Sequence, residues 1–83
     1  MKRTYVMSTD IKSIGYEEDS RLLEIEFLDS SVYQFQNVPK IAHLALMMAP
    51  AKGLHFNNNI KNHFPCIKVT DKKEEDTCLW TNP

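Results

Sequence analysis

The sequence contains no long apolar run. A helix that spans a membrane needs roughly 18 consecutive apolar residues, and no window of the 83 residues approaches that length. Lys2 and Arg3 are followed only by the short apolar stretch from Tyr5 to Met7, which is too short for the apolar region of a secretory signal peptide. These absences argue against membrane insertion and predict a cytoplasmic protein.

Cysteine is scarce as well, with Cys66 and Cys78 as the two copies. A small secreted scaffold held by disulfides typically carries about 4 to 8 cysteines, so we expect reduced thiols, with Cys66 buried and Cys78 exposed. His63 and Cys66 have the spacing of a chelating pair for zinc. The second pair of ligands would then be His55 with Cys78, and these two are not close in sequence. We therefore predict no metal and no cofactor.

The motifs of common catalytic sites are missing too. The chain has two glycines and no glycine-rich phosphate loop, and it has no Ser/His/Asp set or acid pair in a recognisable context. Cys66 has His63 and Lys68 close in sequence, but an activated thiolate needs such groups around it in space. We predict that the protein is not an enzyme.

What the sequence does contain is a segregation of charge along one globular domain. Eighty-three residues, 42% hydrophobic and 25% charged, suffice for one core and no second. Residues 1–29 carry four bases and seven acids, whereas residues 30–70 carry three histidines, no acid and the lysines Lys40, Lys52, Lys61 and Lys68. A positive face of this kind is the electrostatic prerequisite for binding a phosphate-rich partner.

Residues 11–36 have the pattern of three strands. The stretch RLLEIEF alternates apolar and acidic residues with the period of a half-buried strand. The preceding IKSIGY contains Gly15, which suggests a bulge, and in the following SVYQFQ the side chains of Tyr33 and Phe35 share one face. The joining stretches EEDS and LDSS have turn chemistry.

Beyond these strands the apolar period changes to that of a helix. Ile41, Leu44, Ala45 and Met48 fall at i, i+3, i+4 and i+7 after Pro39, so we expect a helix from Pro39 to Met48 that covers the sheet with this stripe. Pro50 ends it. A short second helix is predicted from Lys52 to about Asn57, and CIKV is predicted to be an edge strand or an extended segment.

The predicted fold class is therefore α+β, a three-stranded antiparallel β-meander covered by one main helix and a short second helix. Residues 70–83 are dense in charge and have Leu79 and Trp80 as their apolar anchors. We expect this C-terminal tail to be disordered. Whether Trp80 docks on the domain is left open.

Several of these stretches together resemble the KTSC family. The likeness is carried by IKSIGYEEDSRLLEIEF, by YQF, by VP before the helix and by KGLHFNNNIKNHFP after it. It covers residues 8–69, which makes residues 1–7 an N-terminal extension and residues 70–83 a tail. The chain departs from the family pattern at Phe35, where relatives have a second tyrosine, and at Cys66, where they tend to have an aromatic residue.

The resemblance implies a small bacterial binding domain, because KTSC domains occur as single-domain proteins and at the C-terminus of some lysyl-tRNA synthetases. It also implies a role in RNA binding. Single strands are held by cations that contact phosphates and by aromatic faces that stack on bases. Our candidates for such a nucleic-acid-binding surface are Tyr33, Lys52, His55, Asn59, Lys61, His63 and Lys68.

Two other interpretations of the basic segment stay open. Phe56, Ile60 and Phe64 are spaced by four and are expected to pack against the sheet, while Asn57 can either cap the short helix or contact a ligand.

The alternative function is a protein-protein interaction module without a nucleic-acid ligand, which binds another protein or itself through an edge strand or a homo-oligomeric contact.

Overall fold

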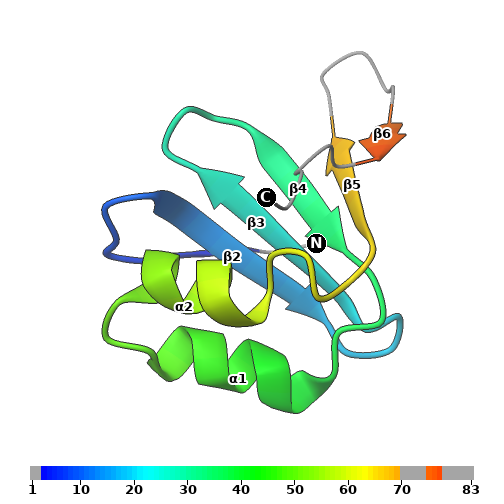
Figure 1. Ribbon diagram of the computed structural model, residues 1–83, viewed down its shortest axis with the longest axis horizontal. Coiled ribbons are helices and arrows are strands. Elements are labelled where there is room, and N and C mark those ends of the chain that lie inside the picture. The colour runs from blue at the N-terminus through cyan, green and yellow to red at the C-terminus, as the bar shows by residue number, and fades with distance from the viewer. Residues whose placement is uncertain (1–2, 70–74, 78–83) are drawn as a thin grey trace.

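The computed structural model describes residues 3–69 and 75–77, and Figure 1 traces them from blue to red. The strands are β1 (Arg3–Tyr5), β2 (Ile11–Glu17), β3 (Leu22–Phe27), β4 (Val32–Phe35), β5 (Cys66–Val69) and β6 (Glu75–Thr77). The helices are α1 (Lys40–Met48) and α2 (Lys52–Asn59). The strands of these described ranges form one six-stranded sheet in the order β1-β2-β3-β4-β5-β6, and every neighbouring pair is antiparallel.

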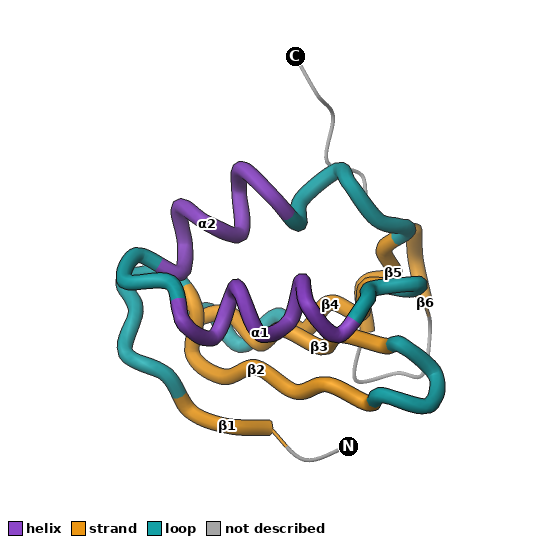
Figure 2. The backbone as a smooth tube through the Cα atoms, turned by 90° about the horizontal axis from the view of Figure 1, so that it is seen from below, coloured by secondary structure: helices purple, strands orange, loops and turns teal. Residues whose placement is uncertain are grey.

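Both helices lie on the same face of this sheet. Figure 2 shows α2 above the strands and α1 in front of β3 and β4, and in the chain both helices lie between β4 and β5. This two-layer arrangement confirms the α+β class with an antiparallel sheet and two helices. No helix in the described part of the chain is long and apolar enough to cross a membrane.

The sheet is larger than the predicted three strands. The predicted meander corresponds to β2, β3 and β4, but β1 adds to one side of it and β5 and β6 to the other. The stretch CIKV is not an edge, since β5 pairs with β4 and with β6. β1 and β6 have three residues each. Strands this short show too little alternation to be recognised in a sequence.

Strand β6 lies within the C-terminal tail that we predicted to be disordered. Residues 75–77 form a strand, so the expectation of disorder is wrong for them. The rest of that prediction, with Leu79 and Trp80, lies outside the described residues. β1 lies within residues 1–7 and pairs with β2, while the boundaries of the domain stay a prediction.

The alternation in β3 sets the two faces of the sheet. Residues directly opposite one another in an antiparallel ladder share a face. One such row is formed by Ile14, Ile25 and Tyr33, and the next by Leu23 and Phe35. Leu23, Ile25 and Phe35 are fully buried, so these rows lie toward the helices. The irregularity in β2 falls between Ile11 and Ser13, and not at Gly15 as the sequence suggested.

The core lies between the sheet and the helices. Its side chains are at most 3% exposed and comprise Ile11, Ile14, Leu23, Ile25, Phe35, Val38, Leu46, Phe56 and Ile60. Phe56 of α2 makes edge-to-face contacts with Phe27 and Phe35, at centroid distances of 5.4 and 5.5 Å. Phe64 packs against the core and is partly buried. The expected burial of the Phe56, Ile60, Phe64 series is therefore confirmed.

The buried face of helix α1 is not the one that we predicted. Ile41 and Met48 are 73% and 82% exposed, and Leu44 is 42% exposed, whereas Leu46 is fully buried. Contacts of the residues that precede the helix explain this orientation. Val38 is buried, and its carbonyl accepts a 2.6 Å hydrogen bond from the Tyr16 hydroxyl. Because this contact fixes where the helix begins, the stripe that starts at Ile41 points away from the sheet.

The second helix is longer than predicted, since α2 extends to Asn59. Pro39 precedes α1 at its cap position, and Ala49 follows the last turn. The Lys52 ammonium donates a 2.9 Å hydrogen bond to the Ala49 carbonyl, which supports the bend between the two helices. Lysine at the C-terminal end of a helix also interacts favourably with the helix dipole.

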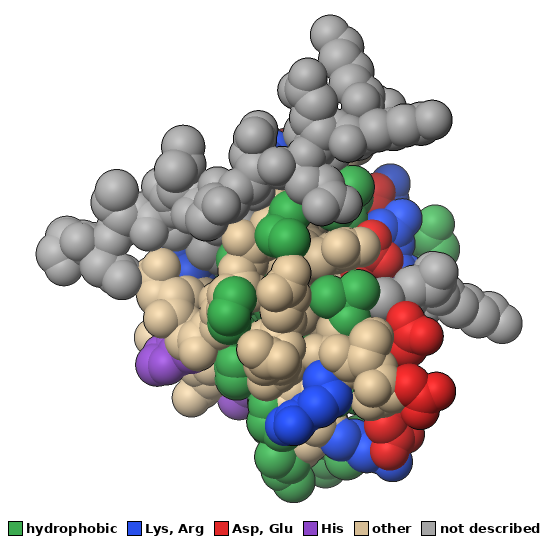
Figure 3. Space-filling model, turned by 90° about the vertical axis from the view of Figure 1, so that its right-hand side faces the viewer, with side chains coloured by type: hydrophobic (Ala, Val, Ile, Leu, Met, Phe, Trp, Pro, Cys, Tyr) green, Lys and Arg blue, Asp and Glu red, His purple; other side chains and the backbone are tan. Residues whose placement is uncertain are grey.

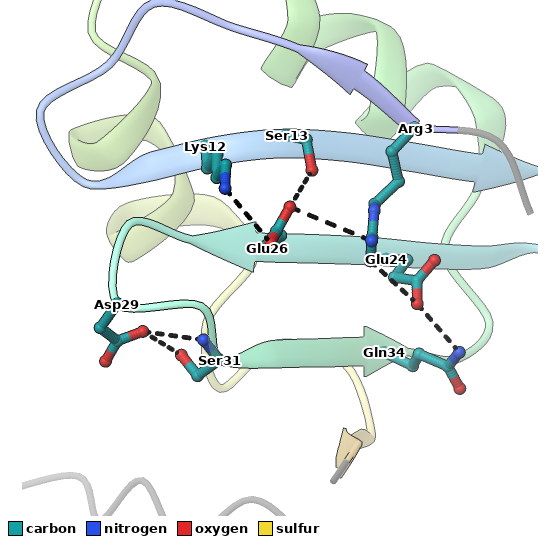
Figure 4. A network of polar contacts seen from close by, with 8 residues as sticks. All are labelled: Arg3, Lys12, Ser13, Glu24, Glu26, Asp29, Ser31 and Gln34. Carbon is teal, nitrogen blue, oxygen red and sulfur yellow. Dashed lines mark hydrogen bonds and ion pairs between the residues drawn. The ribbon is translucent and has the colours of Figure 1, made fainter. Parts of the chain in front are cut away.

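The face of the sheet without helices carries a network of acids and bases, shown in Figure 4. Arg3 lies 3.5 Å from Glu24 and 4.0 Å from Glu26, and Lys12 lies 3.9 Å from Glu26. Ser13 donates a 2.9 Å hydrogen bond to Glu26. These contacts neutralise much of the acidic charge of β3 where it lies, and they hold Arg3 and Lys12 on the face away from the helices.

Candidate functional site

A cavity of about 480 Å³ opens beside α2. Its wall includes the loop before β2, the turn between β3 and β4, and one side of α2. The residues that matter for its chemistry are Asp10, Asp29, Tyr33, Phe56, Asn57 and Lys61. A second cavity of about 390 Å³ shares Thr9, Asp10, Gly53 and Asn57 with the first and continues to Lys52 at the start of α2. We call the two cavities together the α2 groove.

One stripe of α2 and the turn after it faces the groove. Gly53, Asn57 and Lys61 are spaced by four, which places them above one another on a helix. Gly53 makes room for the opposite wall, because a Cβ atom there would lie 2.5 Å from Oδ2 of Asp10. The first turn of α2 has no acid of its own. The Asp10 carboxylate therefore supplies negative charge at the positive end of the helix dipole.

Tyr33 and Lys68 form the next part of the site. They are opposite one another in the β4–β5 ladder, and the Lys68 ammonium lies 5.9 Å from the centre of the Tyr33 ring. Phe27 contacts the Tyr33 ring edge-on at 5.4 Å. Tyr33 is partly buried and Lys68 is exposed. Tyr33 is thus part of the groove wall, and the Lys68 ammonium lies over its ring. Only part of the tyrosine side chain is open to a ligand.

Asp29 adds an ionised carboxylate to the same groove. Its Oδ1 accepts hydrogen bonds from the Ser31 hydroxyl at 2.6 Å and the Ser31 amide at 2.9 Å, as Figure 4 shows. These bonds, with a contribution from the charge of Lys68, lower the pKa of Asp29 below its ordinary value of 3.8. At neutral pH the groove therefore contains hydrogen-bond acceptors as well as lysines.

The structure separates the seven candidate residues into two groups. Tyr33 and Lys61 line the groove, Lys52 lies at its far end and Lys68 lies over Tyr33. His55, Asn59 and His63 do not line it. Asn59 contacts the His55 ring at 3.3 Å and donates to the His55 carbonyl at 3.2 Å, on the outer side of α2, and His63 is exposed in the turn that follows. Their part in binding stays a prediction.

The acidic side chains are gathered in space, but basic side chains lie among them. Figure 3 views the molecule from one end and shows acidic side chains gathered along one side, with histidines on the opposite side. The groove is nevertheless not purely basic. Asp10 and Asp29 come from the acidic N-terminal part of the chain, and sequence reasoning missed them because it read residues 30–70 as a unit. The LDSS turn was the available signal, since Asp followed two residues later by Ser commonly forms such a hydrogen-bonded turn.

Cys66 differs from the expectation of a reduced thiol. It is disulfide-bonded. A sulfur in a disulfide is not the thiolate that metals and electrophiles require. Within residues 3–69 and 75–77, no group of three or more His, Cys, Asp or Glu side chains is arranged to hold a metal ion.

The fold and the groove define a small α+β domain with a groove of mixed polar and aromatic lining. The chain belongs to the KTSC domain family, whose sequence profile matches residues 7–64. This confirms the resemblance in the sequence. A crystal structure of a KTSC domain protein from Yersinia pestis superimposes with a TM-score of 0.81, at 43% identity, over 83% of this chain and 97% of that one.

Relatives of two kinds match this chain. An uncharacterized protein of Stutzerimonas stutzeri is 36% identical over 61 residues, which are 74% of this chain and 86% of that protein. A lysine–tRNA ligase of Nostoc punctiforme is 44% identical over 54 residues, which are 65% of this chain but 10% of the ligase. The domain therefore occurs both as most of a small protein and as a minor segment of a large enzyme.

Proposed function

We propose that this chain is a non-enzymatic RNA-binding domain whose α2 groove holds a single-stranded segment. One observation carries the proposal. Lys61, in the turn after α2, and Tyr33 of β4 line one cavity, and the ammonium of Lys68 on β5 lies over the Tyr33 ring. Cations around an aromatic residue are the combination by which proteins bind single strands without reading a duplex.

The carboxylates determine which part of a nucleotide enters the cavity. Asp10 and Asp29 repel a phosphate, but a carboxylate accepts a hydrogen bond from an exocyclic amino group such as N4 of cytosine. In the proposed complex a base enters the cavity beside Tyr33, and the flanking phosphates contact Lys61, Lys68 and Lys52. The groove then favours cytosine over uracil, which presents a carbonyl oxygen in place of that amino group.

The relatives support the same proposal. Three of them are lysine–tRNA ligases, which by name act on an RNA. The matched segment is 10% of each ligase, so the activity of the whole enzyme does not transfer to this chain. A minor domain attached to an enzyme that handles tRNA is well placed to add affinity for RNA through a second contact.

The experiment that tests the proposal locates the bound RNA on the domain. The ¹⁵N-labelled protein is titrated with a short cytosine oligonucleotide at low salt, and the amide resonances are followed by NMR. We expect the largest shifts at Asn57, Lys61 and Lys68 and small shifts at Lys12 and Glu24 on the opposite face. Shifts centred on that opposite face, or no saturable shifts, would exclude the α2 groove as an RNA site.

The main alternative is a protein partner that pairs with an edge strand. The edges of the described sheet are β1 and β6, with three residues each. An added strand gains its affinity from main-chain hydrogen bonds along the edge, and edges this short offer few of them. The geometry therefore gives β-augmentation less support than it gives the groove.

A further inference from the structure

Lys68 has an acidic residue opposite it on the second side of its strand. In the β4–β5 ladder Lys68 is opposite Tyr33, and in the β5–β6 ladder it is opposite Asp76. Residues directly opposite one another in an antiparallel ladder are close enough to interact, and opposite charges in such a pair attract. The cation that lies over Tyr33 therefore also lies across from an acid of this chain.

Strand β6 carries two acids at positions that are not equivalent. It consists of Glu75, Asp76 and Thr77, and residues 70–74 join it to β5. Successive residues of a strand belong to alternate rows of the sheet. Asp76 belongs to the row of Tyr33 and Lys68, whereas Glu75 is opposite Val69 and belongs to the next row.

The first residue of β5 makes a covalent bond. Cys66 is disulfide-bonded, and the chain has one other cysteine, Cys78, which follows β6 directly in sequence. Ile67 is opposite Thr77, so the register continued by one residue pairs position 78 with Cys66. A disulfide between these two cysteines closes the β5–β6 hairpin at the end away from residues 70–74.

We propose that β6 is an autoinhibitory strand: fastened by a disulfide between Cys66 and Cys78, it holds Asp76 against Lys68 and competes with an RNA phosphate for that cation. The inference rests on the RNA-binding function proposed above and adds a regulation of the same site. A group tethered within one chain acts at an effective concentration on the order of millimolar. An exposed ion pair is weak, so the inhibition is several-fold and not complete.

Reduction of the disulfide releases the strand. One thiolate of a dithiol attacks a cysteine sulfur, and its second thiolate resolves the mixed disulfide. Two electrons and two protons pass from the dithiol to Cys66 and Cys78, which become thiols, and the dithiol becomes a cyclic disulfide. With three residues, β6 has few main-chain hydrogen bonds to hold it without the crosslink.

Fluorescence anisotropy with a labelled cytosine oligonucleotide at low salt compares the full chain before and after reduction with dithiothreitol. We expect the reduced chain to bind about three- to tenfold more tightly, the effect of regaining one phosphate contact. The double variant Cys66→Ser with Cys78→Ser should bind like the reduced chain and should not respond to dithiothreitol.

Asp76→Asn should raise the affinity of the oxidised chain by the same factor as reduction. The matched control is Glu75→Gln, which removes the same charge from the same strand but from the row that does not contain Lys68, and it should bind like the wild type. When Lys68→Gln is already present, Asp76→Asn should have no effect, because the cation for which it competes is gone. Equal effects of Asp76→Asn and Glu75→Gln would overturn the proposed pair.

A measurement without RNA separates this inference from the proposed function. Amide hydrogen exchange of β6 should accelerate at least tenfold on reduction, while that of β1, the equally short strand at the other edge, should not change. Unchanged exchange in β6, or equal RNA affinity of the two redox forms, would overturn the autoinhibition and leave the RNA site in place. Absence of RNA binding in both forms, with β6 released on reduction, would overturn the proposed function and the autoinhibition with it.

Discussion

Lys68 lies directly across the β4–β5 ladder from Tyr33, with its ammonium 5.9 Å from the centre of the tyrosine ring. The cation is thereby held beside the cavity that Tyr33 and Lys61 line. Attraction between an exposed cation and an aromatic ring is worth about 0.5 to 1 kcal/mol. This modest contact is enough to position a lysine that a sequence shows only as one charge among several.

The first prediction concerns this lysine. Lys68→Gln should weaken RNA binding several-fold, because it removes one phosphate contact, and it should lower the free energy of unfolding by no more than about 1 kcal/mol. Lys68→Arg should keep most of the affinity. Fluorescence anisotropy with a labelled cytosine oligonucleotide measures the first effect and urea denaturation the second. Equal affinity of Lys68→Gln and the wild type would remove Lys68 from the site.

The second prediction concerns the close approach of Asp10 to Gly53. Replacing glycine by alanine in a helix stabilises it by up to about 1 kcal/mol, but here the new Cβ would lie 2.5 Å from the Asp10 carboxylate, which must move. Gly53→Ala should therefore stabilise the Asp10→Ala variant more than it stabilises the wild type. A double-mutant cycle of urea denaturation measures this difference. Additive effects would mean that the two residues are not coupled.

The third prediction contrasts two neighbours on α1. Leu46→Ala should cost about 2 to 5 kcal/mol of stability, because it leaves a cavity in the core. Met48→Ala should change stability by no more than about 0.5 kcal/mol, because Met48 is 82% exposed. Thermal or urea unfolding compares the two variants. A large loss in Met48→Ala would contradict the orientation of the helix.

The same helix shows where sequence reasoning was insufficient. Its apolar period predicted the helix almost to the residue, from Pro39 to Met48 against Lys40–Met48 observed. The period could not identify the buried face, because residues on both sides of α1 are apolar. That choice depends on long-range contacts, above all on buried Val38 and its hydrogen bond from Tyr16. No pattern local to the helix contains this information.

The candidate site divides in a similar way. Composition and resemblance led us to choose Tyr33, Lys61 and Lys68. The fold brings these three residues together. It also included His55 and Asn59, which lie on the outer side of α2 and contact each other. Which side of a short polar helix faces a groove depends on what packs behind it. Here Phe56 and Ile60 determine that side, because both are buried in the core.

The fourth prediction concerns pH. His43 stacks on Tyr16 with ring centres 4.6 Å apart, and burial lowers its pKa below the ordinary value of 6.5. Near and below pH 6.5 the unfolded chain therefore binds a proton that the folded chain resists, so stability falls as the pH falls through this range. His43→Gln should flatten that part of the stability curve. Urea denaturation between about pH 5 and 7.5 measures it, and an unchanged slope would show that His43 does not contribute.

The dependence of RNA affinity on salt tests the central claim most directly. Three lysine-phosphate contacts, at about −0.7 each for a single strand, predict a slope of log K against log salt near −2, with a dissociation constant on the order of 10⁻⁴ to 10⁻⁶ M. The informative variant is Lys61→Gln with Lys68→Gln. Its control is Lys12→Gln with Lys40→Gln, which removes the same charge outside the groove. The account predicts a slope near −0.7 for the groove variant and near −2 for the control, whereas equal slopes, or a wild type without salt dependence, would contradict it.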